Sequence, residues 1–209
     1  MQQFVKTHNQ QDSGPLVISF YTEDTPYQFD AFAFMKSCRD LEIDIDIEEV
    51  PNRKSWARNC AFKPFFIKKK LEEHKRAVFW VDVDALFLKK PDFAQLLAWD
   101  FAVREMDNTR DPRFRYHAGS LFFNYTPRSL AFVEVWCAYC SEKLTLEEDP
   151  ICLDQTSLAH LLNVQSDLMI CPLPIAYAKI FDIDEGKISR EEIVIEHYQS
   201  SRRYKNLIS

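Results

Sequence analysis

A run of four apolar residues that ends in two aspartates constrains this sequence more than any other feature. Residues 78–81 read Val-Phe-Trp-Val, and Asp82, Val83 and Asp84 follow directly. An uninterrupted apolar run of this length is typical of a parallel strand that is buried on both faces. The sequence therefore predicts a sheet covered on both sides, with two carboxylates at the end of a central strand.

The segments around this run predict alternating strands and helices. Leu16 to Tyr21 is a short apolar run, Thr25 and Pro26 can begin a helix that continues to Leu41, and isoleucines alternate with acidic residues over 43–48. Further strands are expected at 101–104, 120–124 and 193–196. Helices are expected at 55–73, broken or restarted at Pro64, and at 128–143 and 154–162. Residues 169–175 are expected to form a loop or an edge segment. The alternation predicts an α/β fold with one sheet between helices.

Composition narrows the class of protein. The chain has 209 residues, 46% hydrophobic and 28% charged, which fits one globular domain, with residues 1–14 as a polar N-terminal segment and 15–209 as the domain. The net charge of −6 argues against nucleic acid as a partner. Glycine occurs only as Gly14, Gly119 and Gly186, so the chain has no Gly-rich loop for phosphate.

The Asp-x-Asp pattern occurs three times, and its context differs each time. Asp44 and Asp46 lie on the polar side of an alternating strand and are expected to be solvated, whereas Asp182 and Asp184 precede Gly186 and are expected in a turn. Asp82 and Asp84 instead leave a buried strand, where mutual repulsion would be costly without a cation. Their hard oxygen atoms suit Mg²⁺ or Mn²⁺.

Four segments in order resemble the GT-A fold nucleotide-diphospho-sugar transferases, and in particular glycosyltransferase family 8 and similar small bacterial glycosyltransferases. They are residues 63–93 with the Asp-Val-Asp, His117 to Asn124, Asp154 to Leu162, and Glu196 to Arg203. The resemblance spans about Leu16 to Arg203. It implies a single GT-A (Rossmann-like) domain with a mostly parallel central sheet and helices on both faces.

The resemblance also implies roles for individual residues. Asp82, Asp84 and His197 would bind the metal, Mn²⁺ or Mg²⁺, while His8, His74, His117 and His160 have no comparable position. Asp154 and Gln155 would be catalytic, the Gln facing the anomeric carbon and the Asp bonding sugar hydroxyls. Asp154 is also a candidate cap for the helix that begins at Gln155. The nucleotide sugar would contact Phe20, Tyr21, Thr22, Trp56, Asn59, Lys63, Asp82, Val83, Gly119, Ser120 and Arg202.

The function implied is a metal-dependent glycosyltransferase that uses a nucleotide-diphosphate sugar, with UDP as the default nucleotide and retention of configuration. The acceptor, a glycan, lipid or protein, is left open. One alternative is a catalytically silent GT-A-like binding or interaction module. Another is an Asp-x-Asp phosphatase, which is disfavoured because those enzymes want Thr or Val where this chain has Leu86 and carry the motif on their first strand.

Targeting and redox features are weak. The polar N-terminus and the lack of a long apolar run favour a cytoplasmic protein, with peripheral attachment to a membrane surface left open. Cys137 and Cys140 form a C-x-x-C pattern, but they fall within a predicted helix. We therefore expect buried thiols rather than a redox or zinc site.

Overall fold

The computed structural model of the chain describes residues 5–7, 14–107, 110–146, 152–164, 167–204 and 207. The strands are β1 (Val5–Thr7), β2 (Leu16–Thr22), β3 (Ile45–Val50), β4 (Val78–Val81), β5 (Ala85–Phe87), β6 (Phe101–Glu105), β7 (Tyr116–Phe123), β8 (Ile170–Pro172), β9 (Lys179–Ile180) and β10 (Ile195–His197). The helices are α1 (Tyr27–Asp40), α2 (Trp56–Cys60), α3 (Lys63–His74), α4 (Pro127–Leu146), α5 (Leu153–Val164) and α6 (Ser201–Tyr204).

The main sheet has seven strands in the order β1-β3-β2-β4-β7-β6-β8. Strands β3, β2 and β4 run parallel to one another, β7 runs antiparallel between β4 and β6, and β8 is parallel to β6. Strand β1 is an antiparallel edge strand beside β3. The predicted mostly parallel α/β sheet is confirmed, with β1 and β7 as its antiparallel members.

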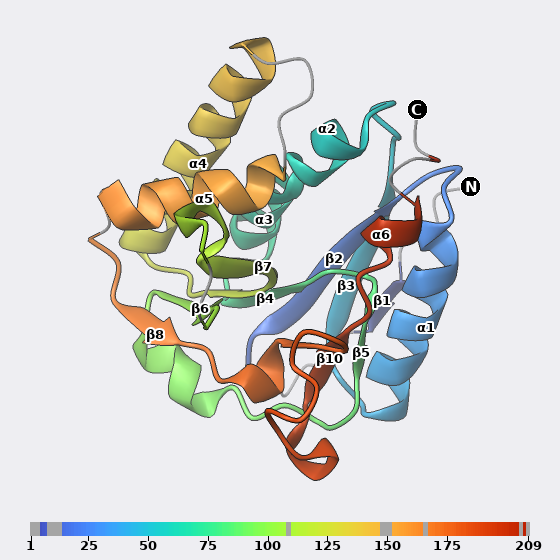
Figure 1. Cartoon of the computed structure of the whole chain (residues 1–209). Coiled ribbons are helices and arrows are strands. Elements are labelled where there is room, and N and C mark those ends of the chain that lie inside the picture. The colour runs from blue at the N-terminus through green and yellow to red at the C-terminus, as the bar shows by residue number, and fades with distance from the viewer. Residues whose placement is uncertain are drawn as a thin grey trace.

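Both faces of the sheet are covered, as the apolar run 78–81 predicts. Phe79 and Val81 contribute to a core that includes α1, whereas Val78 and Trp80 contribute to a core that includes α3, α4 and α5. Figure 1 shows α1 on one side of the sheet and α3, α4 and α5 on the other. The two cores alternate along β4 because successive side chains of a strand point to opposite faces.

A second, three-stranded sheet has the order β5-β10-β9. Strand β5 begins directly after Asp84 and pairs antiparallel with β10, so that His197 lies opposite Ala85. The sequence predicts the strand at 193–196 but neither β5 nor β9, because strands of two or three residues are too short to show a period. This small sheet brings the C-terminal residues back to the end of β4.

The expectation for Asp44 and Asp46 needs correction. Asp44 and Asp46 are not solvated: Asp46 is fully buried against Lys70 and His74, and Asp44 pairs with Arg76. The restart predicted at Pro64 is confirmed, since α2 ends at Cys60 and α3 begins at Lys63 with Pro64 in its first turn. The N-terminal segment, expected only to be polar, contributes β1.

Three other expectations agree with the structure. Residues 170–172 form the edge strand β8, Asp182 and Asp184 lie in a turn, and Cys137 and Cys140 are buried free thiols in α4. Among the described residues, no helix is both long and apolar enough to cross a membrane.

Candidate active site

One pocket lies at the edge of the sheet where β2 and β4 end. Because β7 is antiparallel, its first residues lie at the same edge, and the first turn of α5 and the short helix α2 complete the walls. The pocket is lined by Phe20, Tyr21, Thr22, Tyr27, Trp56, Asn59, Cys60, Lys63, Trp80, Asp82, Val83, Asp84, His117, Ala118, Gly119, Cys152, Asp154, Gln155, Gln199 and Ser201. The carboxyl ends of parallel strands are the usual place for a ligand in such sheets.

Most of the predicted site residues meet in this pocket. Of those named from the sequence, the pocket lining includes Phe20, Tyr21, Thr22, Trp56, Asn59, Lys63, Asp82, Val83, Asp84, Gly119, Asp154 and Gln155. Ser120 and His197 are buried just behind Gly119 and do not line it. Arg202 is exposed in α6, forms an ion pair with Asp182 and also lies outside the lining.

Asp82 and Asp84 are held in different ways. Oδ1 of Asp82 accepts a hydrogen bond from Nε1 of Trp80 at 2.8 Å, and Oδ2 of Asp84 accepts one from the backbone N–H of Ser200 at 2.8 Å. Burial, and then the negative charge of Asp82, raise the pKa of Asp84 to about 7. A cation near these carboxylates would relieve that repulsion.

Lys63 is the one positively charged side chain among the described residues that line the pocket. Its ammonium Nζ lies 2.6 Å from Oδ2 of Asp154, 3.0 Å from Oδ1 of Asp82 and 3.0 Å from the carbonyl oxygen of Ala118. Burial alone would lower the pKa of this amine, but Asp154 and then Asp82 hold it above its usual value. Lys63 therefore stays charged and joins α3 to α5, β7 and the end of β4.

The sequence suggested that Asp154 caps α5, but the structure shows that it does not. The helix begins at Leu153, so that Asp154 lies within its first turn, buried and paired with Lys63. Gln155 follows it in the same turn and lines the pocket. The predicted catalytic pair is thus placed with one member fixed by an ion pair and the other facing the cavity.

Two histidine rings pack behind Gly119. His197 and His117 meet edge to face with ring centroids 4.7 Å apart, and Nε2 of His197 lies 2.8 Å from Oγ of Ser120. Burial lowers the pKa of His197 to about 4 and that of His117 well below its usual value, so both rings are neutral. The buried Nδ1 of His117 has no hydrogen-bond partner among the described residues.

The opposite wall of the pocket is aromatic and amide-rich. Nε1 of Trp56 donates to the hydroxyl of Tyr27 at 3.3 Å, and Phe20 packs against Phe62, Phe66 and Trp80 with centroids 5.2–5.5 Å apart. The side-chain amide of Asn59 bonds the backbone N–H of Arg53 and Oδ1 of Asn52. Asn59 therefore orders the loop before α2 in addition to lining the pocket.

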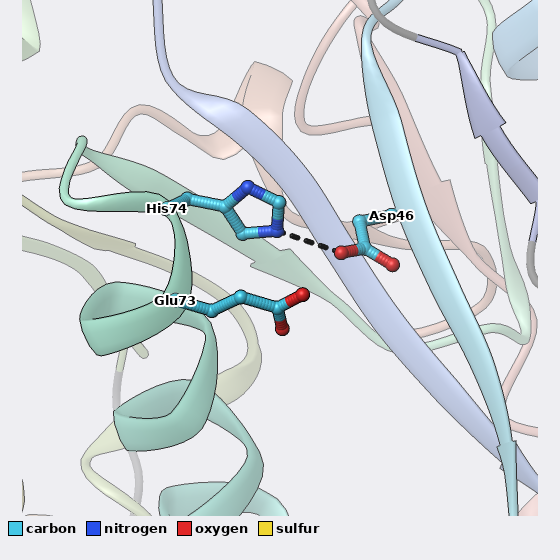
Figure 2. A group of neighbouring side chains, drawn as sticks. All are labelled: Asp46, Glu73 and His74. Carbon is cyan, nitrogen blue, oxygen red and sulfur yellow. Dashed lines mark hydrogen bonds and ion pairs between the residues drawn. The ribbon is translucent and has the colours of Figure 1, made fainter.

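The described part of the chain brings one other group of candidate metal ligands together. Asp46, Glu73 and His74 have ligand atoms within 4.8 Å of one another, whereas Asp82, Asp84 and His197 do not form such a group. Figure 2 shows His74 and Glu73 pointing from α3 toward Asp46 of β3. Lys70 already supplies a cation there, with Nζ 2.7 Å from Asp46 and 3.3 Å from Glu73, so an ion pair network accounts for this possible metal-binding group.

Sequence reasoning missed several residues of the pocket. Tyr27, Cys60, Trp80, His117, Ala118, Cys152, Gln199 and Ser201 were not predicted to be there. His117 could have been found, because residues two apart on a strand share a face and Gly119 was already a candidate. Gln199 and Ser201 depend on the path of the chain after β10, which carries no sequence pattern.

Comparison with known proteins identifies the fold. No protein-family model and no curated protein sequence matches the chain. Solved structures do match: a glycosyltransferase involved in the glycosylation of the major capsid of PBCV-1 has a TM-score of 0.68 at 12% identity, over 90% of this chain and 96% of that one. The chain has the GT-A glycosyltransferase fold.

Two other glycosyltransferases support this conclusion. GlyE of Streptococcus pneumoniae TIGR4 aligns with a TM-score of 0.60 at 14% identity, over 90% of this chain but only 55% of GlyE. Mouse xyloside xylosyltransferase 1 aligns with a TM-score of 0.52 at 9% identity, over 89% of this chain and 97% of that one. At such identities the likeness concerns the fold.

Proposed function

We propose that this chain is a metal-dependent glycosyltransferase. It would move a sugar from a nucleotide-diphosphate donor, with UDP as the nucleotide, to a glycan, lipid or protein acceptor, and retain the anomeric configuration. We further propose a cytoplasmic location, in line with the sequence.

The observation that carries this proposal is the content of the pocket. Asp82, Asp84, Asp154 and Gln155 come from two separate segments and line one cavity at the carboxyl edge of a GT-A sheet. Three carboxylates and an amide around one cavity are not needed to end a strand, and their desolvation is costly. Their convergence is expected of a site that binds a ligand.

The donor atoms of Asp82 and Asp84 fit a hard divalent cation, since both offer carboxylate oxygens, and burial and then the charge of Asp82 raise the pKa of Asp84. The neutral ring of His197 fits the third ligand in chemistry, although its Nε2 bonds Ser120 in this structure. When bound, Mn²⁺ or Mg²⁺ would supply charge neutralisation for the diphosphate leaving group.

The chain's own residues would position the donor. The aromatic wall with Trp56 and the end of β2 suits a nucleotide base and ribose. Asp154 would accept hydrogen bonds from sugar hydroxyls, and the amide oxygen of Gln155 would stabilise positive charge at the anomeric carbon. The bond from that carbon to the diphosphate breaks, the bond to the acceptor oxygen forms on the same face, and the acceptor's proton passes to the departing diphosphate.

Thermal unfolding with MnCl₂ and UDP tests this proposal in wild type and Asp84→Asn. Ligand at 100 times its Kd adds about 2.7 kcal/mol, which for a chain of this size raises Tm by roughly 5–10 °C. We expect that rise in wild type only when metal and UDP are both present, and its loss in Asp84→Asn. Asp40→Asn removes an exposed carboxylate on α1 and should keep the full rise.

A wild-type protein with no rise for any pair of divalent metal and nucleoside diphosphate would contradict the donor site. The silent interaction module would then be the better explanation. A rise that persists in Asp84→Asn would place metal and nucleotide elsewhere.

A further inference from the structure

Lys63 occupies an unusual position for a residue expected to touch a phosphate. Its side chain is only 5% exposed, and it belongs to the first turn of α3, where Pro64 follows it. Lys63 lines the pocket, and its ammonium reaches α5, β7 and the end of β4 at once. The face of the Trp80 ring, 5.3 Å from Nζ, lines its path.

Counting protons shows what this ammonium can still do. A lysine ammonium has three N–H donors and no acceptor. Three acceptors lie within 3.0 Å of Nζ: Oδ2 of Asp154, Oδ1 of Asp82 and the carbonyl oxygen of Ala118. Each of the three donors therefore has an acceptor within 3.0 Å inside the protein, without any contact to a diphosphate oxygen.

The charges lead to the same conclusion. One positive charge faces two carboxylates at hydrogen-bond distance, so the charge of the ammonium is already more than compensated by its neighbours in the protein. Each carboxylate binds Lys63 through a single oxygen. Among the described residues, no donor reaches Oδ2 of Asp82 or Oδ1 of Asp154, and both side chains line the pocket.

We propose that Lys63 is a positioning residue that fixes one oxygen of Asp82 and one of Asp154, so that the other oxygen of each serves the ligand. It does not itself bind the donor diphosphate. This inference rests on the proposed function, and it replaces the expectation that Lys63 contacts phosphate.

A charge-balanced double variant tests the idea. Lys63→Gln adds one net negative charge to the pocket, and Asp154→Asn removes one, so Lys63→Gln/Asp154→Asn keeps the wild-type charge. If Lys63 acts only through the carboxylates, calorimetry with MnCl₂ should show that the double variant binds UDP within about threefold of wild type. Turnover of UDP-glucose, or of another UDP-sugar that wild type uses, should fall at least tenfold in the same variant.

A direct phosphate contact predicts a different pattern. UDP affinity would then fall tenfold or more in both Lys63→Gln and the double variant, while uridine affinity stays unchanged, and this result would overturn the inference. Lys68→Gln serves as the control, because Lys68 lies on the same helix with its ammonium paired to the exposed Glu134. It should change neither affinity nor turnover.

Two further measurements keep the test decisive. Lys63→Arg keeps the charge but cannot make three contacts from one nitrogen. A positioning role therefore predicts that this variant loses turnover and retains UDP affinity, and unchanged turnover would contradict that role.

Urea unfolding of wild type, Lys63→Gln, Asp154→Asn and the double variant reports the Lys63–Asp154 coupling without any ligand. Additive effects there would overturn the inference, whereas absence of UDP binding by wild type would overturn only the proposed function.

Discussion

Gly119 and His197 are packed so closely that no side chain fits between them. A Cβ at position 119 would lie 2.9 Å from Cε1 of His197 and 2.6 Å from Cε1 of His117. The resemblance implied that this glycine contacts the nucleotide sugar. The structure gives a separate reason for a glycine at this position, because the two buried histidine rings need the space.

We predict that Gly119→Ala destabilises the fold. Both rings are buried and packed against each other, and overpacking of this kind costs about 1–3 kcal/mol. Urea unfolding should show this loss. Gly14→Ala is the matched control, since a Cβ there meets nothing within 4 Å. Equal stability of the two variants would show that the histidine pair is loosely packed.

The sequence predicted the parts of this fold that have a long or strict pattern. The apolar run 78–81 gave a strand buried on both faces, and Pro64 marked the start of a helix. It could not predict the pairing of β5 with β10, which joins residues more than a hundred positions apart. For the site, the residues that follow or end strands, 20–22 and 82–84, could be predicted from the sequence because ligands bind at such ends.

The alternation of apolar and polar residues identifies the two faces of a strand, but it does not show which elements cover each face. Asp46 was expected in water because aspartate usually lies there. In the structure Lys70 reaches it from α3 at 2.7 Å, and this contact depends on how α3 crosses the sheet. His117 was missed for a similar reason, since its importance comes from His197, eighty residues later in the chain.

Trp56 should contribute strongly to nucleotide affinity. It lines the pocket, and stacking of a base on an aromatic side chain is worth about 1–3 kcal/mol. We predict that Trp56→Ala weakens UDP and uridine by the same factor, about tenfold, in calorimetric titrations with MnCl₂. Trp99→Ala, an exposed tryptophan outside the pocket, should leave both unchanged. Unchanged UDP affinity in Trp56→Ala would mean that Trp56 serves only to pack against Tyr27.

Gln155 should matter for turnover and not for nucleotide binding. Stabilisation of charge that develops only in the transition state lowers the barrier without raising ground-state affinity. We predict that Gln155→Ala reduces UDP-sugar turnover by about 100-fold and leaves the Kd of UDP within about twofold. Gln95→Ala changes an exposed glutamine far from the pocket and should have no effect. A parallel loss of UDP affinity would instead assign Gln155 to nucleotide binding.

Asp184 should make stability depend on pH below neutrality. Burial alone would raise its pKa, but hydrogen bonds from Arg104, at 2.5 and 2.7 Å, and from the backbone N–H of Ile180 hold the pKa below its usual value. Because the folded-state pKa is the lower one, the stabilisation is complete above the usual aspartate pKa of about 3.9 and is lost as pH falls below it.

Urea unfolding of Asp184→Asn between pH 6 and pH 2 measures this effect. At pH 6 we predict a loss of about 3 kcal/mol relative to wild type, because Arg104 is left buried without its partner. The difference should shrink as pH falls from 4 to 2, because the Asp184 carboxylate of the unfolded wild-type chain takes up a proton there, whereas the folded chain keeps its ion pair with Arg104. Asp182→Asn breaks an exposed pair with Arg202 and should cost less than about 1 kcal/mol throughout. A difference for Asp184→Asn that stays constant across this range would show that the carboxylate charge is not what Arg104 requires.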